Sequence, residues 1–124
     1  PLHLACSGGH LEVAKALIAA GGKVNSGNSY GNPPIYGAIM GGHYETADML
    51  LESGADPKWA NNKASTLLHF LAYSPLGEAA KKSMAVKLID AGVDFNAQDD
   101  DGLTTLHITA RDGDSALAQL LLEK

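Results

Sequence analysis

The chain has 124 residues, 45% of them hydrophobic and 19% charged, which is typical of one compact folded unit. Nine basic and fourteen acidic residues give a formal net charge of −5, and the basic residues are scattered. This argues against a nucleic-acid partner, because such proteins gather Lys and Arg on one face. No apolar run is long enough to cross a bilayer, so direct membrane insertion is not expected.

Cysteine usage points to a cellular compartment. Cys6 is the only cysteine, so an internal disulfide is impossible, and the sequence has no Asn-x-Ser/Thr glycosylation acceptor. Both features fit a reducing environment. We therefore expect an intracellular protein, cytoplasmic or nuclear.

A short phrase recurs along the chain at a nearly fixed interval. Its third position is His3, then Tyr36 after 33 residues, His69 after another 33, and His107 after 38. Self-similarity at a period of about 20–50 residues indicates a stacked-repeat architecture.

The first repeat, residues 1–31, predicts two short helices and an extended turn. The first helix should cover about residues 2–7, and the second about residues 11–20, ended by Gly21 in a left-handed conformation. The stripe of apolar residues on the second helix consists of Leu11, Ala14, Leu17 and Ile18. Residues 24–31 are rich in Asn, Ser and Gly, which favours a projecting turn.

The same two-helix pattern returns in the rest of the chain. Equivalent apolar residues recur at Ala47, Leu50 and Leu51, at Ala85, Leu88 and Ile89, and at Ala118, Leu121 and Leu122. Isolated helices shorter than about 12–15 residues are marginal in water. Each helix pair should therefore be stabilised by packing on its neighbours.

Several phrases in register resemble the ankyrin repeat. They include Pro1-Leu2-His3-Leu4-Ala5, Gly9-His10-Leu11, Leu50-Leu51-Glu52-Ser53-Gly54-Ala55-Asp56 and Asp101-Gly102-Leu103-Thr104-Thr105-Leu106-His107. The resemblance covers the whole chain. It implies an all-α repeat, an ankyrin-repeat solenoid of stacked helix-turn-helix units with projecting β-hairpin fingers and a concave groove lined by inner helices.

The resemblance also divides the chain. It implies a single ankyrin-repeat domain over residues 1–124, with repeats over about 32–64 and 65–102 between partial repeats 1–31 and 103–124. Because the first and last repeats are incomplete, we expect both ends to be truncated and the protein to continue into further repeats. Four leucines crowd the last helix, and we expect additional repeat or capping residues to cover them. They are Leu117, Leu120, Leu121 and Leu122.

The third repeat departs from the family pattern. Its histidine and the glycine after its second helix are separated by 23 residues, against 18 in the first repeat, so we expect five extra residues in a loop near residues 74–78. Lys63-Ala64 stands where the family has Asp-Gly, which predicts a less regular finger tip. In the second repeat, Pro33 replaces the threonine that caps the inner helix in the family.

Histidines and aspartates invite metal hypotheses that the patterns do not support. The resemblance implies that His3, His69 and His107 bond backbone groups, and the two histidines beside glycine, His10 and His43, are also expected to be structural. Residues 99–102 read Asp-Asp-Asp-Gly, but a calcium loop in this register would need oxygen donors where Ala97 and Ile108 stand. No metal or cofactor is expected.

No enzyme class is indicated. The sequence has no phosphate-binding loop, no His-Glu-x-x-His and no Gly-x-Ser-x-Gly elbow. Cys6 stands where the family has alanine, and a small buried residue is a better interpretation than a nucleophile.

The expected function is non-catalytic binding of a partner protein or peptide. The resemblance places variable positions on the inner helices at Ser7, Gly8, Met40, Gly41, Tyr73, Ser74, Arg111 and Asp112. It places finger positions at Ser29, Tyr30, Asn32, Trp59, Asn62, Ser65, Asp100 and Leu103. We expect Met40, Tyr73 and Arg111 to fall on one line, since aromatics, Met and Arg are enriched in interfaces.

Alternatives remain open for several of these residues and for the chain. Tyr73 can instead pack on the nearby insertion, and Trp59 can shield the irregular finger. The chain can also be a targeting or regulatory part of a larger enzyme, or a structural spacer in a long array.

Overall fold

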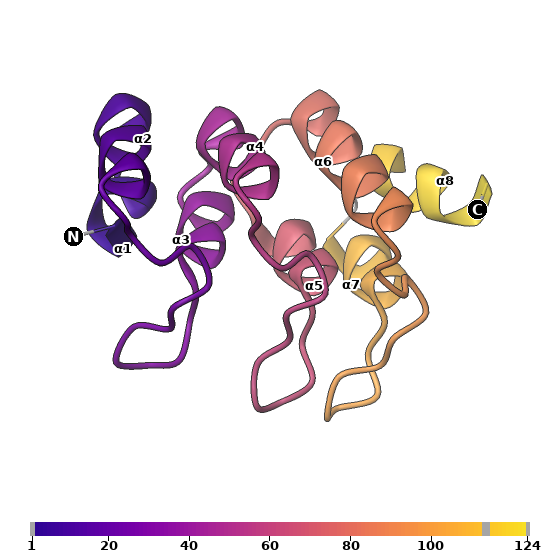
Figure 1. The fold of residues 1–124 in the computed structure, drawn as a ribbon. Helices are drawn as coiled ribbons and strands as arrows, with labels where there is room; N and C mark the ends of the chain where they lie inside the picture. The colour runs from indigo at the N-terminus through magenta and orange to yellow at the C-terminus, as the bar shows by residue number, and fades with distance from the viewer. Residues whose placement is uncertain (1, 113–114, 124) are drawn as a thin grey trace. The chain divides into compact units, whose positions relative to one another are not determined.

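The computed structural model describes residues 2–112 and 115–123, and within them the fold is helical. These described residues form eight helices in chain order, and each short inner helix is followed by an outer one (Figure 1). The chain divides into two compact units, residues 1–56 (unit 1) and residues 57–124 (unit 2). The expectation of a single domain stays a prediction.

Unit 1 contains two helix pairs packed on each other. Helices α1 (Leu2–Ser7) and α3 (Pro34–Met40) are the inner pair, and α2 (Leu11–Ala19) and α4 (Tyr44–Glu52) are the outer pair. Inner helices contact each other, outer helices contact each other, and each inner helix contacts its own outer helix (Figure 1). The predicted helices at residues 2–7 and 11–20 are confirmed to within one residue.

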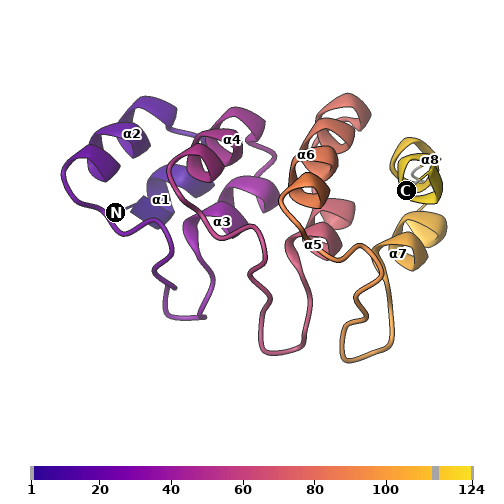
Figure 2. The same ribbon diagram turned by 45° about the vertical axis from the view of Figure 1, so that its right-hand side comes forward.

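Unit 2 repeats this arrangement. Helices α5 (Leu67–Tyr73) and α7 (Thr105–Asp112) are inner, and α6 (Glu78–Asp90) and α8 (Ser115–Glu123) are outer (Figure 2). The contacts again link inner to inner, outer to outer, and inner to outer. The fully buried side chains of this unit include Leu67, Leu68, Leu71, Met84, Ala85, Leu88 and Leu117.

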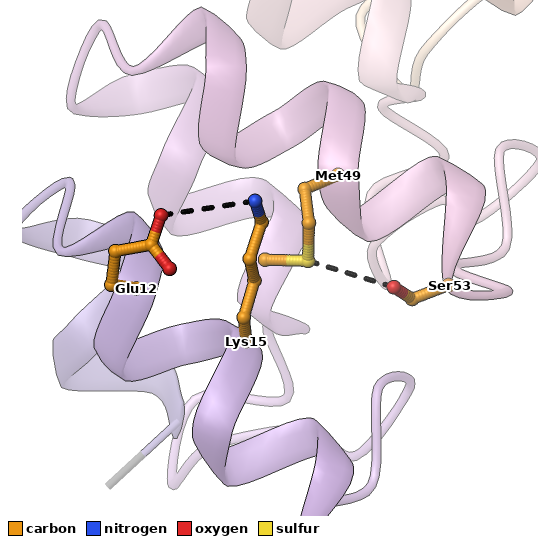
Figure 3. A network of polar contacts seen from close by, with 4 residues as sticks. All are labelled: Glu12, Lys15, Met49 and Ser53. Atoms are coloured by element: carbon orange, nitrogen blue, oxygen red, sulfur yellow. Dashed lines mark hydrogen bonds and ion pairs between the residues drawn. The ribbon is translucent and has the colours of Figure 1, made fainter.

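Two of the polar contacts on the outer helices of unit 1 are weak. Figure 3 shows Glu12 and Lys15 on α2, whose charged groups are 3.9 Å apart, and Met49 on α4, whose sulfur accepts a hydrogen bond from Ser53 Oγ at 3.5 Å. Exposed ion pairs contribute little to stability. The buried apolar residues of the unit, among them Ala14, Ile35, Ala38 and Leu50, contribute more than such pairs do.

The insertion in the third repeat lies mostly in a helix, not in a loop. Helix α6 has 13 residues, whereas α2 and α4 have nine each. Only residues 74–77 separate α5 from α6, so the expected lengthened loop is largely wrong. The reason is the segment Glu78-Ala79-Ala80-Lys81-Lys82, in which every residue is a strong helix former.

Described residues of the last helix are better covered than expected. Leu117, Leu120 and Leu121 are buried, and only Leu122 is largely exposed, at 73%. The expectation that further repeat or capping residues cover this helix stays a prediction, and it now concerns only Leu122. No helix in the described parts of the chain combines the length and apolar character required to span a bilayer.

The described residues form no β-strand, and the expected β-hairpin fingers are not confirmed. Within the described residues the loops between helix pairs contain turns, and an isolated antiparallel bridge joins Ala60 and Thr66.

Candidate functional site

The loop tips share one hydrogen-bonded turn. Its first residue is Asn28, Asn61 or Asp99, and the side-chain oxygen of that residue accepts from the backbone N–H groups two and four positions later, at 2.9–3.1 Å. Its backbone N–H also donates to the carbonyl four positions later, at 2.9–3.0 Å. Asn and Asp favour such turns because their short side chains imitate a backbone acceptor.

The tip of the third repeat is as regular as the others, which corrects the expectation from Lys63-Ala64. The fourth residue of each turn has a positive φ, 81° at Gly31, 60° at Ala64 and 78° at Gly102. Ala64 is the one non-glycine residue with positive φ in the described parts of the chain. The hydrogen bonds of Asn61 thus hold alanine in a conformation that glycine adopts without strain.

Histidine and threonine fix the start of α5. Thr66 is the N-cap, and its backbone N–H donates to His69 Nδ1 at 3.0 Å, with the Thr66 hydroxyl 2.9 Å from the same nitrogen. On the other side of the ring, Nε2 lies 2.8 Å from the carbonyl of Leu103. Because a carbonyl only accepts, Nε2 carries the proton and Nδ1 is the acceptor.

The same residues recur in other repeats. Thr104 and His107 make the equivalent contacts at the start of α7, at 3.0 Å and 2.8 Å. His3 Nε2 donates to the carbonyl of Ser26 at 2.6 Å. In the second repeat Pro33 makes no side-chain cap, as its replacement of threonine predicts. These ring nitrogens hold backbone groups in place.

The histidines form no metal site in the part of the chain that is described. No three His, Cys, Asp or Glu side chains lie close enough together there to hold an ion. The ring of His43 instead lies against Gly9, where it would clash with any side chain, and the φ of 72° at Gly9 also favours glycine.

Tyr73 and Arg111 meet at the ends of the inner helices of unit 2. Arg111 Nη2 donates to Tyr73 Oη at 3.0 Å, and the guanidinium carbon lies 5.7 Å from the centre of the tyrosine ring. A cation within about 6 Å of a ring centre is attracted by its electron-rich face. Tyr73 is 44% exposed and Arg111 is also exposed, so the pair lies on the surface.

Comparison with known families gives two matches that cover most of the chain. Residues 1–61 match a family described as ankyrin repeats (3 copies), and residues 68–122 match one described as ankyrin repeats (many copies). The chain belongs to the ankyrin-repeat family. A search of curated proteins gave no match. Ankyrin repeats are generally protein–protein interaction modules and are generally non-catalytic.

The ankyrin inner-helix positions differ in how the structure places them. Tyr73 and Arg111 are brought together, as their shared register predicts. Met40 ends α3 in unit 1 and is half-buried. Ser74 is buried and accepts from the N–H of Leu76 at 3.2 Å, which corrects its expected place on the binding surface. The side chain of Asp112 lies outside the described residues.

The ankyrin finger positions divide into exposed and partly buried residues. Tyr30 is 86% exposed, and Asn62 and Asp100 are also exposed. Asn32, Ser65 and Leu103 are half-buried because their backbone groups close the turns, and Leu103 also accepts from His69. These three residues have structural roles that the sequence analysis did not assign.

Trp59 packs against the inner helix that follows its loop. Its ring is half-buried and stacks on Phe70 of α5, with ring centres 6.0 Å apart and planes at 28°. Offset stacking of this kind stabilises aromatic pairs. The contact supports a packing role for Trp59 beside any role in recognition.

Cys6 is buried, and its chemistry is that of a core residue. It has no exposed surface, and burial raises the pKa of its thiol to about 11. Thiolate, not thiol, is the nucleophile. Cys6 is therefore un-ionised at neutral pH, which agrees with the interpretation as a small buried side chain.

Proposed function

We propose that this ankyrin-repeat chain is a non-catalytic binding module for a partner protein or peptide, with Tyr73 and Arg111 at the centre of the contact surface. The observation that carries the proposal is the pairing of these two side chains on the exposed ends of α5 and α7. Tyr and Arg are the residues, with Trp, that most often dominate binding energy at interfaces.

Pre-organisation supports this assignment. An exposed arginine loses side-chain entropy when a partner immobilises it, at about 0.5–1.5 kcal/mol for a rotamer-rich side chain. Here the hydrogen bond and the ring contact already restrict Arg111 and Tyr73 before any partner arrives. Less of the binding energy is then needed to order the surface.

Further residues extend the proposed surface. On the inner side they are Met40 and Asp112, and on the loops they are Tyr30, Asn32, Trp59, Asn62, Ser65, Asp100 and Leu103. The proposal includes a continuous solenoid in which inner helices line a concave face and loops form its rim. The three aspartates at residues 99–101 would steer a basic region of the partner, since such fields act mainly on association rates.

An intracellular location, cytoplasmic or nuclear, belongs to the proposal. It is supported by a single cysteine that is buried as a free thiol.

The test begins with capture of partners by the intact chain, followed by calorimetry with the purified partner. We expect Tyr73→Ala and Arg111→Ala each to weaken binding by about 1–2 kcal/mol, with thermal unfolding nearly unchanged. Lys82→Ala, on the exposed face of the outer helix α6, is the matched control and should bind like the native chain. Unaltered affinity in both surface variants would move the site elsewhere.

A further inference from the structure

The inner helices α1 and α3 end in the same glycine turn. Gly9 and Gly42 follow these helices with positive φ values of 72° and 77°. The N–H of each glycine donates at 3.1 Å to the carbonyl three residues earlier, that of Cys6 or Ile39. A left-handed glycine often ends a helix in this way, because its turn binds carbonyl groups that have no partner within the helix.

Helix α5 cannot end in the same turn. Pro75 occupies the position of the glycine, six residues after the histidine slot at His69, and proline has no N–H to donate. Proline also disfavours a helical conformation in the residue before it, and Ser74 is extended, with φ −65° and ψ 149°. The carbonyl of Ala72, which is the equivalent acceptor in this repeat, therefore needs another donor.

The insertion of the third repeat supplies that donor. Lys81 Nζ donates to the carbonyl of Ala72 at 3.1 Å, from the added part of α6, which packs beside α5 (Figure 2). A cation at the last turn of a helix also interacts favourably with the helix dipole. A side-chain cap thus replaces the glycine turn of the regular repeats.

The capped carbonyl belongs to the peptide group that leads into Tyr73. Because a peptide group is planar, fixing the Ala72 carbonyl also fixes the position of the Tyr73 Cα atom. From this Cα the Tyr73 side chain reaches Arg111, whose Nη2 donates to the tyrosine hydroxyl at 3.0 Å. The cap on α5 therefore helps to decide whether Tyr73 and Arg111 meet.

We propose, resting on the proposed function, that Lys81 is a positioning residue for the binding surface, which holds Tyr73 in contact with Arg111 by capping α5 at Ala72. Lys81 acts through Tyr73 and not by touching the partner. Without this cap the last turn of α5 loosens, and the contact between Tyr73 and Arg111 forms in a smaller fraction of molecules. Ordering the two side chains then costs binding energy, which lowers affinity.

The first experiment needs no partner. NMR spectra of the intact chain record nuclear Overhauser cross-peaks between the ring protons of Tyr73 and the side-chain protons of Arg111. Lys81→Met keeps the apolar stem and removes the donor, Lys81→Arg keeps a charged donor, and Lys82→Met changes an exposed neighbour on the same helix. We expect the cross-peaks to be lost or strongly weakened in Lys81→Met and to keep their native intensity in the other two variants.

A second variant makes this result independent of the residue introduced. Lys81→Ala removes the whole side chain and should give the same loss of cross-peaks. Urea denaturation identifies conditions in which each variant is folded. Native cross-peaks in either folded variant, Lys81→Met or Lys81→Ala, would overturn the inference.

Affinity separates positioning from a general loss of stability. Calorimetry at a temperature at which all variants are folded compares their binding of the captured partner. Lys81→Met should weaken binding about two- to tenfold, the range that ordering one side chain costs, and Lys81→Arg should bind like the native chain. In a Tyr73→Ala background Lys81→Met should cause no further loss, because Tyr73 transmits its effect. A loss of equal size with and without Tyr73 would contradict a positioning role.

Failure of this inference is distinguishable from failure of the proposed function. If Tyr73→Ala weakens partner binding while Lys81→Met leaves both the cross-peaks and the affinity native, the binding surface stands and only the role of Lys81 fails. If the cross-peaks depend on Lys81 but neither Tyr73→Ala nor Arg111→Ala affects the partner, the cap is structural and the proposed function fails.

Discussion

Ala64 shows how a hydrogen-bonding side chain can substitute for glycine at a turn. Its φ of 60° is in the left-handed region, where an L residue with a Cβ is disfavoured by about 1–2 kcal/mol. Asn61 offsets this strain through its two side-chain hydrogen bonds to Lys63 and Ser65. The sequence could have revealed the turn, because Asn28, Asn61 and Asp99 recur at its first position.

Replacing Ala64 by glycine should therefore stabilise the protein. We expect a gain of about 0.5–1 kcal/mol in the free energy of unfolding, because relief of strain exceeds the entropy that glycine adds to the unfolded chain. Urea denaturation measures the change, and Gly102→Ala in the neighbouring turn should show the opposite sign. A less stable Ala64→Gly variant would contradict the explanation.

The buried thiol of Cys6 gives a prediction at high pH. Its pKa in the folded state, about 11, lies above its ordinary value of 9.0, so the folded chain holds the proton more tightly than the unfolded chain. The stabilisation is complete below pH 9 and is lost as pH rises through 11. Relative to Cys6→Ala, the native chain should therefore lose free energy of unfolding between pH 9 and pH 11, as urea denaturation can measure. Parallel pH profiles for the two proteins would show that thiol ionisation is not coupled to folding.

At the scale of elements, the caps decide where the inner helices begin. Thr66 and His69 satisfy backbone groups at the first turn of α5, and His69 also binds the carbonyl of Leu103 in the next loop. The recurring histidine slot predicted this role, because it occupies the third position of α3, α5 and α7 as Tyr36, His69 and His107.

Removing the Thr66 cap should weaken the fold measurably. We expect Thr66→Ala to lower the free energy of unfolding by about 1 kcal/mol, the usual cost of losing a threonine N-cap. Thr66→Ser keeps the hydroxyl and should retain most of the stability. If serine and alanine cost the same in urea denaturation, the hydroxyl is not responsible for the effect.

Helix boundaries were predicted well in the regular repeats and poorly at the insertion. Helices α1 and α2 begin and end within one residue of expectation, because glycines and apolar spacing define them. The spacing between the histidine and the glycine of the third repeat shows that residues have been added, but it does not show which element contains them. Local helix propensity decided the outcome, and Glu78, Ala79, Ala80 and Lys81 extend α6.

At the scale of the molecule, the residues that maintain the fold and the proposed binding residues overlap only at the loops, where Asn32, Ser65 and Leu103 close turns and Trp59 packs on Phe70. The fold depends on buried apolar side chains and on Thr and His contacts with the backbone. The centre of the proposed surface is the exposed pair Tyr73 and Arg111 at the ends of inner helices. The equivalent positions of Tyr73 and Arg111 in successive repeats predicted that they lie near each other. Their direct hydrogen bond could not be predicted, because the spacing of residues in the sequence does not determine side-chain conformations.

The sequence analysis also gave no role to Lys81, which contacts the last turn of α5. Lys81 lies in the insertion, which has no equivalent in the regular repeats. The ankyrin pattern therefore predicts no role for it. Its bond to the Ala72 carbonyl depends on the extension of α6 and becomes visible only when that helix is placed beside α5.

The most direct test measures affinity and stability together in one set of variants. Tyr73→Ala, Arg111→Ala and Thr66→Ala are compared for binding of the captured partner by calorimetry and for unfolding by urea denaturation. The account predicts a loss of about 1–2 kcal/mol in binding with little change in stability for the first two, and the reverse for Thr66→Ala. Unchanged binding for Tyr73→Ala and Arg111→Ala, in proteins that remain folded, would contradict it.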